Sequence, residues 1–120
     1  MEQYKLFDAE FKFLHIIWGV EPVTTRRLTK LCQEKLGWKR TTTYTVLRRL
    51  KDRGILKNEN STVSSIVKQE QVQKYESEAI VKKAFDGSLP KFIAAFLNDK
   101  TLSDQEAKEI KRLIDCHKEG

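Results

Sequence analysis

The sequence has few of the features that would place it among disulfide-rich or membrane proteins. Its 120 residues include only two cysteines, Cys32 and Cys116, so no disulfide framework is implied. No stretch approaches the roughly 18 consecutive apolar residues that a membrane-spanning helix needs. The opening residues, MEQYKLFDAEF, lack the basic and then apolar order of a secretory signal. We therefore expect a cytoplasmic protein that does not insert into a membrane.

Motifs of catalysis and of metal binding are also missing. The chain has no glycine-rich phosphate loop, no HExxH and no Ser/His/Asp spacing. His15 is expected on the apolar side of the first helix, where a structural histidine is the default. Cys116 and His117 form only an adjacent pair, which falls short of a closed thiolate site. The sequence therefore predicts no enzyme, no metal and no cofactor.

Positive charge is concentrated in the first half of the chain. Residues 1–68 carry 14 Lys and Arg against 7 Asp and Glu, whereas residues 69–120 carry 9 against 10. This distribution is typical of a phosphate-binding module joined to an assembly module. An ordinary solvated, lysine-rich face is the alternative, and charge alone would favour it. The densest run, residues 39–57, has one acid and seven basic residues, namely Lys39, Arg40, Arg48, Arg49, Lys51, Arg53 and Lys57.

The first half of the chain has the pattern of three helices followed by a β-hairpin. Apolar spacing predicts helices within residues 8–19, 24–37 and 39–54. Thr24 or Thr25 can cap the second helix, which Gly37 ends, and Thr41 or Thr42 can cap the third. Two short segments with strand character, 55–57 and 63–67, are separated by a turn-forming run. Three helices and a hairpin in this order are the winged helix-turn-helix arrangement.

The second half reads as three helices with more apolar surface than they can cover themselves. Helices are expected over residues 70–85 and 89–97, the second of them capped by Ser88. A third begins at Thr101 or Ser103, where Ser103 opens a capping box. Pairing with a second copy is the economical way to cover the apolar side chains. The predicted dimerisation residues are Leu89, Phe92, Ile93, Phe96, Leu97, Ile110, Leu113 and Ile114.

The predicted fold is therefore mainly α with a small β-hairpin wing. A winged-helix DNA-binding domain is expected over residues 1–69 and a helical dimerisation region over residues 70–120. Short or flexible donors at the start of the third helix are the predicted contacts to bases of double-stranded DNA. They are Thr42, Thr43, Tyr44 and Thr45. The predicted phosphate contacts are Lys39, Arg40, Arg48, Arg49 and Lys51.

A purely structural interpretation of the same residues stays open at this point. The threonines can be caps, Tyr44 can cover the edge of the core, and the arginines can serve solubility. The order of the helices, the wing and the charge asymmetry together favour DNA.

The chain resembles the penicillinase-repressor (BlaI/MecI/CopY) family of transcriptional regulators over nearly its whole length. The similarity is carried by a Trp, a Thr-x-x-Thr, a Leu-x-Arg-Leu and a Gly in order, and by the later DGSL and Phe. These lie in FDAEFKFLHIIW (7–18), PVTTRRLTKLC (22–32), WKRTTTYTVLRRLKDRGIL (38–56), FDGSLPKFIAAFL (85–97) and LSDQEAKEIKRLI (102–114). The resemblance implies a homodimer with two winged helices on a palindromic operator. It also implies that Thr42, Tyr44 and Thr45 face bases and that Arg49 meets a phosphate.

Regulation is a further implication of this resemblance. Such repressors silence β-lactamase or related resistance genes, and a membrane sensor-protease system relieves them by cleavage within the short helix after the Gly-Ser. The matching bond here is Ala95–Phe96, where antibiotic-responsive members have Asn–Phe. Copper-responsive members carry a Cys-x-Cys cluster that this chain lacks. A metal-regulated or otherwise regulated repressor of the same fold, and a winged-helix protein-interaction module, are the alternatives.

Overall fold

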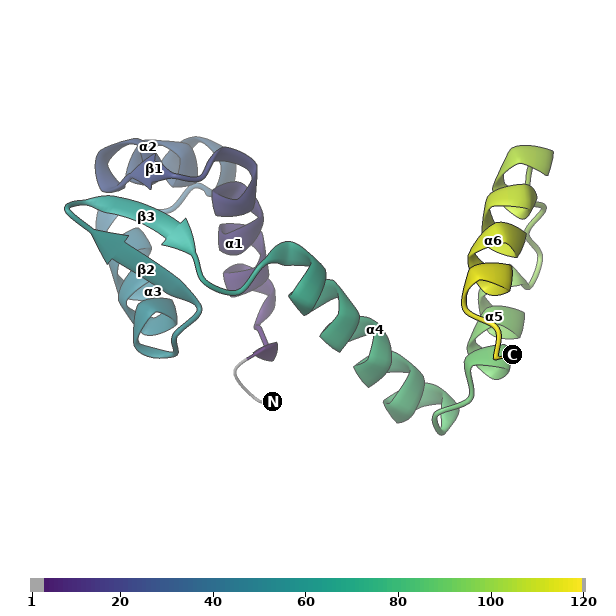
Figure 1. Cartoon of the computed structure of the whole chain (residues 1–120). Coiled ribbons are helices and arrows are strands. Elements are labelled where there is room, and N and C mark those ends of the chain that lie inside the picture. Colours follow the sequence, from purple (N-terminus) through teal and green to yellow (C-terminus); the bar gives the residue numbers. More distant parts are fainter. Residues whose placement is uncertain (1–3, 120) are drawn as a thin grey trace. The chain divides into compact units, whose positions relative to one another are not determined.

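The computed structural model describes residues 4–119 and divides the chain into two compact units, Met1–Ala79 and Ile80–Gly120. Within the described residues the chain forms six helices and one three-stranded antiparallel sheet (Figure 1). The predicted fold class, a winged helix followed by a helical region, is confirmed.

Three helices build most of the first unit: α1 (Asp8–Val20), α2 (Thr25–Leu36) and α3 (Arg40–Asp52). The Thr24 side chain caps α2 by accepting a hydrogen bond from the amide of Arg27, as the sequence predicted. Gly37 ends α2 with a φ of 68°, a conformation that favours glycine. The predicted capping of α3 by Thr41 or Thr42 is wrong. Its N-cap is Lys39, so both threonines lie inside the helix.

The wing is a sheet of three strands, β1 (Val23–Thr24), β2 (Leu56–Glu59) and β3 (Thr62–Ser65). β3 lies in the middle and pairs antiparallel with both neighbours, in the order β1-β3-β2. The two-residue turn at Asn60 and Ser61 has positive φ at both positions, as a tight hairpin with twisted strands requires. The hairpin is confirmed, with a first strand one residue longer and a second strand one residue shorter than predicted. The sequence did not indicate β1.

One hydrophobic core lies between α1, α2, α3 and the sheet. Its fully buried members include Phe13, Leu14, Ile17, Leu28, Leu50, Ile55, Leu56, Val63 and Val72. Trp38 stacks on Phe13 with 5.6 Å between ring centroids. The prediction for His15 is wrong, because this side chain is exposed. Phe13, Leu14, Ile16 and Ile17 are the buried residues of α1 in that region, and His15 instead lies beside Phe11 on the outer surface.

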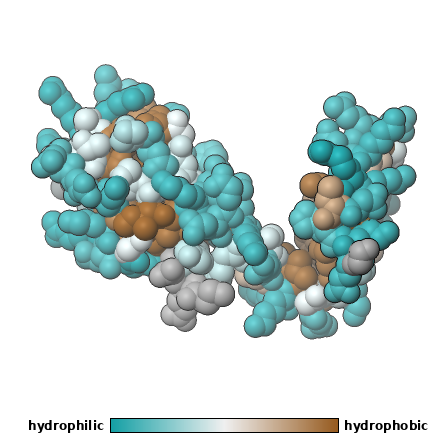
Figure 2. Space-filling view, in the orientation of Figure 1, coloured by the Kyte–Doolittle hydropathy of each residue, from teal (hydrophilic) through white to brown (hydrophobic). Residues whose placement is uncertain are grey.

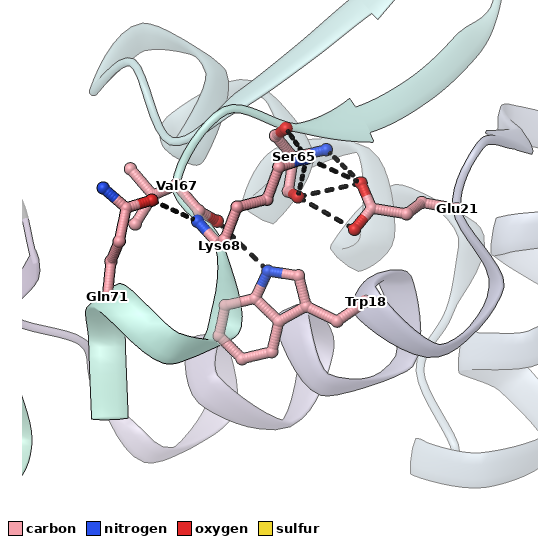
Figure 3. Close-up of polar contacts among 6 residues, drawn as sticks. All are labelled: Trp18, Glu21, Ser65, Val67, Lys68 and Gln71. Carbon is pink, nitrogen blue, oxygen red and sulfur yellow. Dashed lines mark hydrogen bonds and ion pairs between the residues drawn. The ribbon is translucent and has the colours of Figure 1, made fainter. Parts of the chain in front are cut away.

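Polar side chains join the end of α1 to the end of the wing (Figure 3). The Trp18 indole N–H donates to the carbonyl of Val67, and the Glu21 carboxylate accepts from both the amide and the hydroxyl of Ser65. Lys68 Nζ lies 2.8 Å from the Ser65 carbonyl oxygen and 3.7 Å from Glu21 Oε1. These bonds fix the chain where it leaves β3 and enters α4 (Gln69–Phe85).

The second unit consists of the end of α4 together with α5 (Leu89–Leu97) and α6 (Asp104–Cys116). Ser88 and Ser103 cap the two later helices by accepting from the amides of Lys91 and Glu106, as predicted. Phe92 packs edge-on against Phe85 at 5.5 Å. Neither α5 nor α6 contains a buried residue. Apolar side chains are visible on the surface of this unit in Figure 2.

Candidate nucleic-acid interface

The outward face of α3 carries hydroxyls at its start and guanidinium groups farther along. Thr41, Thr45, Arg48 and Arg49 are all exposed and recur every three to four residues, so they form one stripe along the helix. Thr42 is also exposed and lies on one flank of the stripe. The Thr45 hydroxyl donates to the carbonyl of Thr41 at 2.9 Å. Three of the four predicted base contacts, Thr42, Tyr44 and Thr45, thus have accessible side chains.

Thr43 is the exception, and its predicted place on the outward face is wrong. Its side chain is turned into the core and the residue is only 1% exposed. Its hydroxyl has no hydrogen-bond partner of good geometry among the described residues. It does lie close enough to the Cys32 thiol to oppose, in part, the rise in the pKa of that thiol caused by burial. Thr43 therefore links α3 to α2 inside the protein.

Tyr44 lies on the other flank of α3, half-buried, with the Arg40 guanidinium 5.7 Å from the centre of its ring. The pKa of the Tyr44 hydroxyl is lowered, first by Arg40 and then by the side chain of Thr25 at the start of α2. A cation over the ring face and a donor near the hydroxyl both restrict this side chain. Tyr44 is therefore held at the edge of the stripe and remains accessible.

Cations surround this face of α3. Four of the predicted phosphate contacts are exposed: Lys39, Arg40, Arg48 and Lys51. A hollow of about 270 Å³ lies between α3 and β2 and is lined by Tyr44, Leu47, Arg48, Lys51 and Asn58. α3 and the wing therefore line one surface, and Arg48 and Lys51 both lie on it.

Arg49 is not a free cation. Its Nη1 lies 3.6 Å from Glu10 Oε2, and Glu10 is buried at the start of α1. Arg53 meets the same carboxylate at 3.4 Å from Oε1. Sequence reasoning missed this contact, although Glu10 shares its helical stripe with the buried Phe13, Leu14 and Ile17. An acid in an apolar stripe signals a buried carboxylate that needs a partner.

The predicted dimerisation residues of α5 and α6 are solvent-accessible in the single chain. Six of them are large apolar residues with at least 39% of their surface exposed: Leu89, Ile93, Phe96, Ile110, Leu113 and Ile114. Phe92 and Leu97 are half-buried. The Ala95–Phe96 bond lies within α5, and the Lys100 ammonium sits 3.8 Å from the centre of the Phe96 ring.

The described residues, 4–119, contain no group of three or more His, Cys, Asp or Glu side chains arranged to hold a metal ion. Cys116 is exposed, and His117 Nδ1 lies 2.8 Å from the carbonyl oxygen of Leu113. No helix in this part of the chain is both long and apolar enough to cross a membrane.

Comparison with known proteins gives a consistent result. The sequence profile of the family described as Penicillinase repressor matches residues 6–116. The chain is 23% identical to the methicillin resistance regulatory protein MecI of Staphylococcus aureus, over 92% of this chain and 94% of that protein. It is 22% identical to the penicillinase repressor of Bacillus licheniformis, over 95% of this chain and 92% of that protein. An uncharacterised 16.5 kDa protein of Latilactobacillus sakei is 23% identical over 92% of this chain and 78% of its own length.

Proposed function

This chain belongs to the penicillinase repressor family, a family of transcriptional repressors, and on that premise we propose that it represses transcription as a homodimer bound to a palindromic operator. The observation that carries the proposal is the outward face of α3. The exposed threonines Thr42 and Thr45 are flanked there by exposed cations at Lys39 and Arg48. Short hydrogen-bonding side chains at base edges with cations on either side are what major-groove recognition by a helix requires.

In this proposal α3 enters the major groove with its first turns. Thr42 and Thr45 reach base edges or the methyl group of thymine, and Tyr44 reaches a base or its sugar at the flank. Lys39, Arg40, Arg48 and Lys51 meet phosphates, as does the accessible side of Arg49. The hollow between α3 and β2 lies over the backbone, because Arg48 and Lys51 line it.

The test of base recognition uses a duplex selected from random DNA by the wild-type protein. Thr42→Ala and Tyr44→Ala are then measured against a panel of single-base variants of that duplex. We expect each substitution to relax the preference at one or two base pairs by about 1–3 kcal/mol. Thermal stability should barely change for Thr42→Ala, because Thr42 does not cap α3.

A matched control for this panel is Thr101→Ala, which removes an exposed threonine from the second unit. Its ranking of the panel should equal that of the wild type. If Thr42→Ala and Tyr44→Ala also rank the panel as the wild type does, neither residue reads a base. If the wild type selects no sequence at all from random DNA, the proposed repressor function fails.

Dimerisation is proposed to occur through the helical region predicted over residues 70–120. The support is that α5 and α6 leave six large apolar side chains uncovered in one chain. Contiguous apolar surface of this kind marks an association site in soluble proteins. Sedimentation at micromolar concentration should give twice the mass of the chain. A monomer under those conditions would exclude this arrangement.

Relief of repression is proposed to follow cleavage of the Ala95–Phe96 bond by a membrane sensor-protease system. The regulated genes are then resistance genes, by analogy with the relatives whose names refer to methicillin and penicillinase. The bond lies inside α5, so a protease reaches it only after local unfolding of that helix. Mass spectrometry of the protein from producing cells, before and after exposure to a β-lactam, should reveal a fragment ending at Ala95. A protein that stays intact while its target genes are induced would exclude this mode of relief.

A further inference from the structure

Glu10 is a buried carboxylate that joins the first helix to the predicted recognition helix. The residue is only 1% exposed, and its Oε1 accepts a hydrogen bond of 3.0 Å from the amide of Phe7. Arg53 Nη1 lies 3.4 Å from Oε1 and 3.5 Å from Oε2. Arg49 Nη1 lies 3.6 Å from Oε2. One acid of α1 therefore contacts two cations at the end of α3.

The two arginines are held to different degrees. Arg53 has 28% of its side chain exposed, and its Nη2 also donates to the carbonyl of Lys5 at 2.6 Å. Arg49 keeps 49% of its side chain exposed while it is paired with Glu10. A guanidinium has five N–H donors in a rigid fork, so one side can hold a carboxylate while the other meets a phosphate. The exposed half of Arg49 therefore leaves donors for a phosphate while the pair with Glu10 persists.

We propose that Glu10 is a positioning residue for DNA binding, which fixes the Arg49 guanidinium in the place where it meets a backbone phosphate. This inference rests on the proposed function. A mobile arginine attracts the phosphates of any duplex through its charge. An arginine that is held in one place also fixes the register of α3 in the groove. Glu10 would thus raise the preference for the correct sequence without touching DNA.

The direction of the change in affinity distinguishes positioning of Arg49 from general electrostatic attraction to DNA. Glu10→Gln removes one negative charge near the DNA-binding face, which by itself strengthens binding to every duplex. It also releases Arg49 from its anchor, which weakens only the contacts that depend on register. We therefore expect unchanged or slightly tighter binding to a random-sequence duplex. Binding to the selected duplex should become weaker, so that the ratio of the two affinities falls about tenfold, the size of one well-placed contact.

The experiment measures the binding of full-length protein to both duplexes by fluorescence anisotropy over a series of salt concentrations. The control is Glu34→Gln, which changes the net charge equally but alters an exposed acid of α2. We expect the control to keep the wild-type affinity ratio. In Glu10→Gln the salt dependence on random duplex should stay at least as steep as in the wild type, because no cation is lost.

A loss of affinity in Glu10→Gln that is equal for both duplexes would overturn the proposal, because a merely structural role lowers both affinities by the same factor. An unchanged ratio in a folded Glu10→Gln protein would also overturn it. If Glu10→Gln does not fold, as judged by circular dichroism, Glu10→Asp replaces it, with the same charge and a shorter reach. Its affinity ratio should also fall, and a wild-type ratio would overturn the proposal.

The route through Arg49 is tested by combining Glu10→Gln with Arg49→Lys. If Glu10 acts through the guanidinium of Arg49, the double variant should lose little more sequence preference than Glu10→Gln alone. Independent, additive losses would show that Glu10 does not act through Arg49. If the wild-type protein showed no preference for any selected duplex, the proposed repressor function itself would fail. That result differs from every outcome that concerns Glu10.

Discussion

The two units of this chain bury their apolar side chains to very different degrees. In the first unit, α1, α2, α3 and the sheet enclose one core whose largest members are fully buried. In the second unit neither α5 nor α6 has a buried residue, and six large apolar side chains are exposed. A core of the first kind supports a fold without help, whereas helices of the second kind need a partner surface. In the proposed function, the second unit supplies the surface for assembly and the first unit supplies the surface for DNA.

The two cysteines sharpen this contrast because each lies in a different unit. Cys32 is buried, and burial raises the pKa of its thiol, while Cys116 is exposed. The thiolate is the reactive form, and Cys32 reacts only when its unit opens. We expect a thiol reagent at pH 8 to label Cys116 at least about a thousandfold faster than Cys32, as follows from unfolding free energies of about 5 kcal/mol. Mass spectrometry of timed samples measures both rates. Comparable rates would contradict the difference in burial between the two cysteines.

A charge on the uncovered surface should produce the next largest effect. Phe96→Asp places a carboxylate on a residue that is 54% exposed and predicted to lie in the dimer. Because an unpaired charge is costly in an apolar interface, we expect the dissociation constant of the dimer to rise about a hundredfold. The control is Ile66→Asp, at an exposed apolar residue of the first unit. Analytical ultracentrifugation compares the two, and equal dimerisation of both variants would contradict the assignment.

Arg48→Ala should have a smaller effect, confined to DNA binding. Arg48 is exposed on α3 and lines the hollow beside β2. Loss of one phosphate contact should weaken binding to all duplexes alike and reduce the slope of log K against log salt by about one unit. Arg112→Ala removes an exposed arginine of α6 and serves as the control. A sequence-dependent loss in Arg48→Ala, with an unchanged slope, would assign Arg48 to a base instead.

The smallest expected effect is a dependence on alkaline pH. Arg40 and then Thr25 lower the pKa of Tyr44, so its hydroxyl ionises below the usual pH of a tyrosine. A phenolate beside DNA repels phosphate, so affinity should be complete below the lowered pKa and decline as the pH rises through it. Tyr44→Phe should bind without this decline. Anisotropy between pH 7.5 and about 10 tests it, and an identical decline in both proteins would exclude Tyr44 as its source.

Local signals in the sequence identified most elements of the fold. The caps at Thr24, Ser88 and Ser103 and the glycine after α2 depend on short-range chemistry, and all four lie where they were expected. β1 has only two residues and exists because β3 pairs with it, so no local pattern could indicate it. The strands of the hairpin have other bounds than predicted because Asn58 and Glu59, which have turn-forming composition, pair with Val63 and Thr62 in the sheet.

The candidate site was less predictable, and its errors have physical causes. Thr43 was assigned to the outward face on its polarity, although it lies three, four and seven residues before Val46, Leu47 and Leu50, which are all buried. Helical periodicity alone would have placed it in the core. The pairing of Glu10 with Arg49 joins residues 39 positions apart in sequence. The apolar stripe of α1 is enough to suggest that Glu10 is buried. Its partner, however, depends on how α1 packs against α3.

The indole hydrogen bond between Trp18 and Val67 has a spectroscopic consequence. The chain has two tryptophans, Trp18 and Trp38, and both belong to the first unit. Intrinsic fluorescence excited at long ultraviolet wavelengths therefore reports on that unit alone, with one emitter hydrogen-bonded at the point where the wing ends. Far-ultraviolet circular dichroism reports helices of both units. In a single titration with urea, fluorescence follows the first unit, and a change in circular dichroism without a change in fluorescence belongs to the second unit.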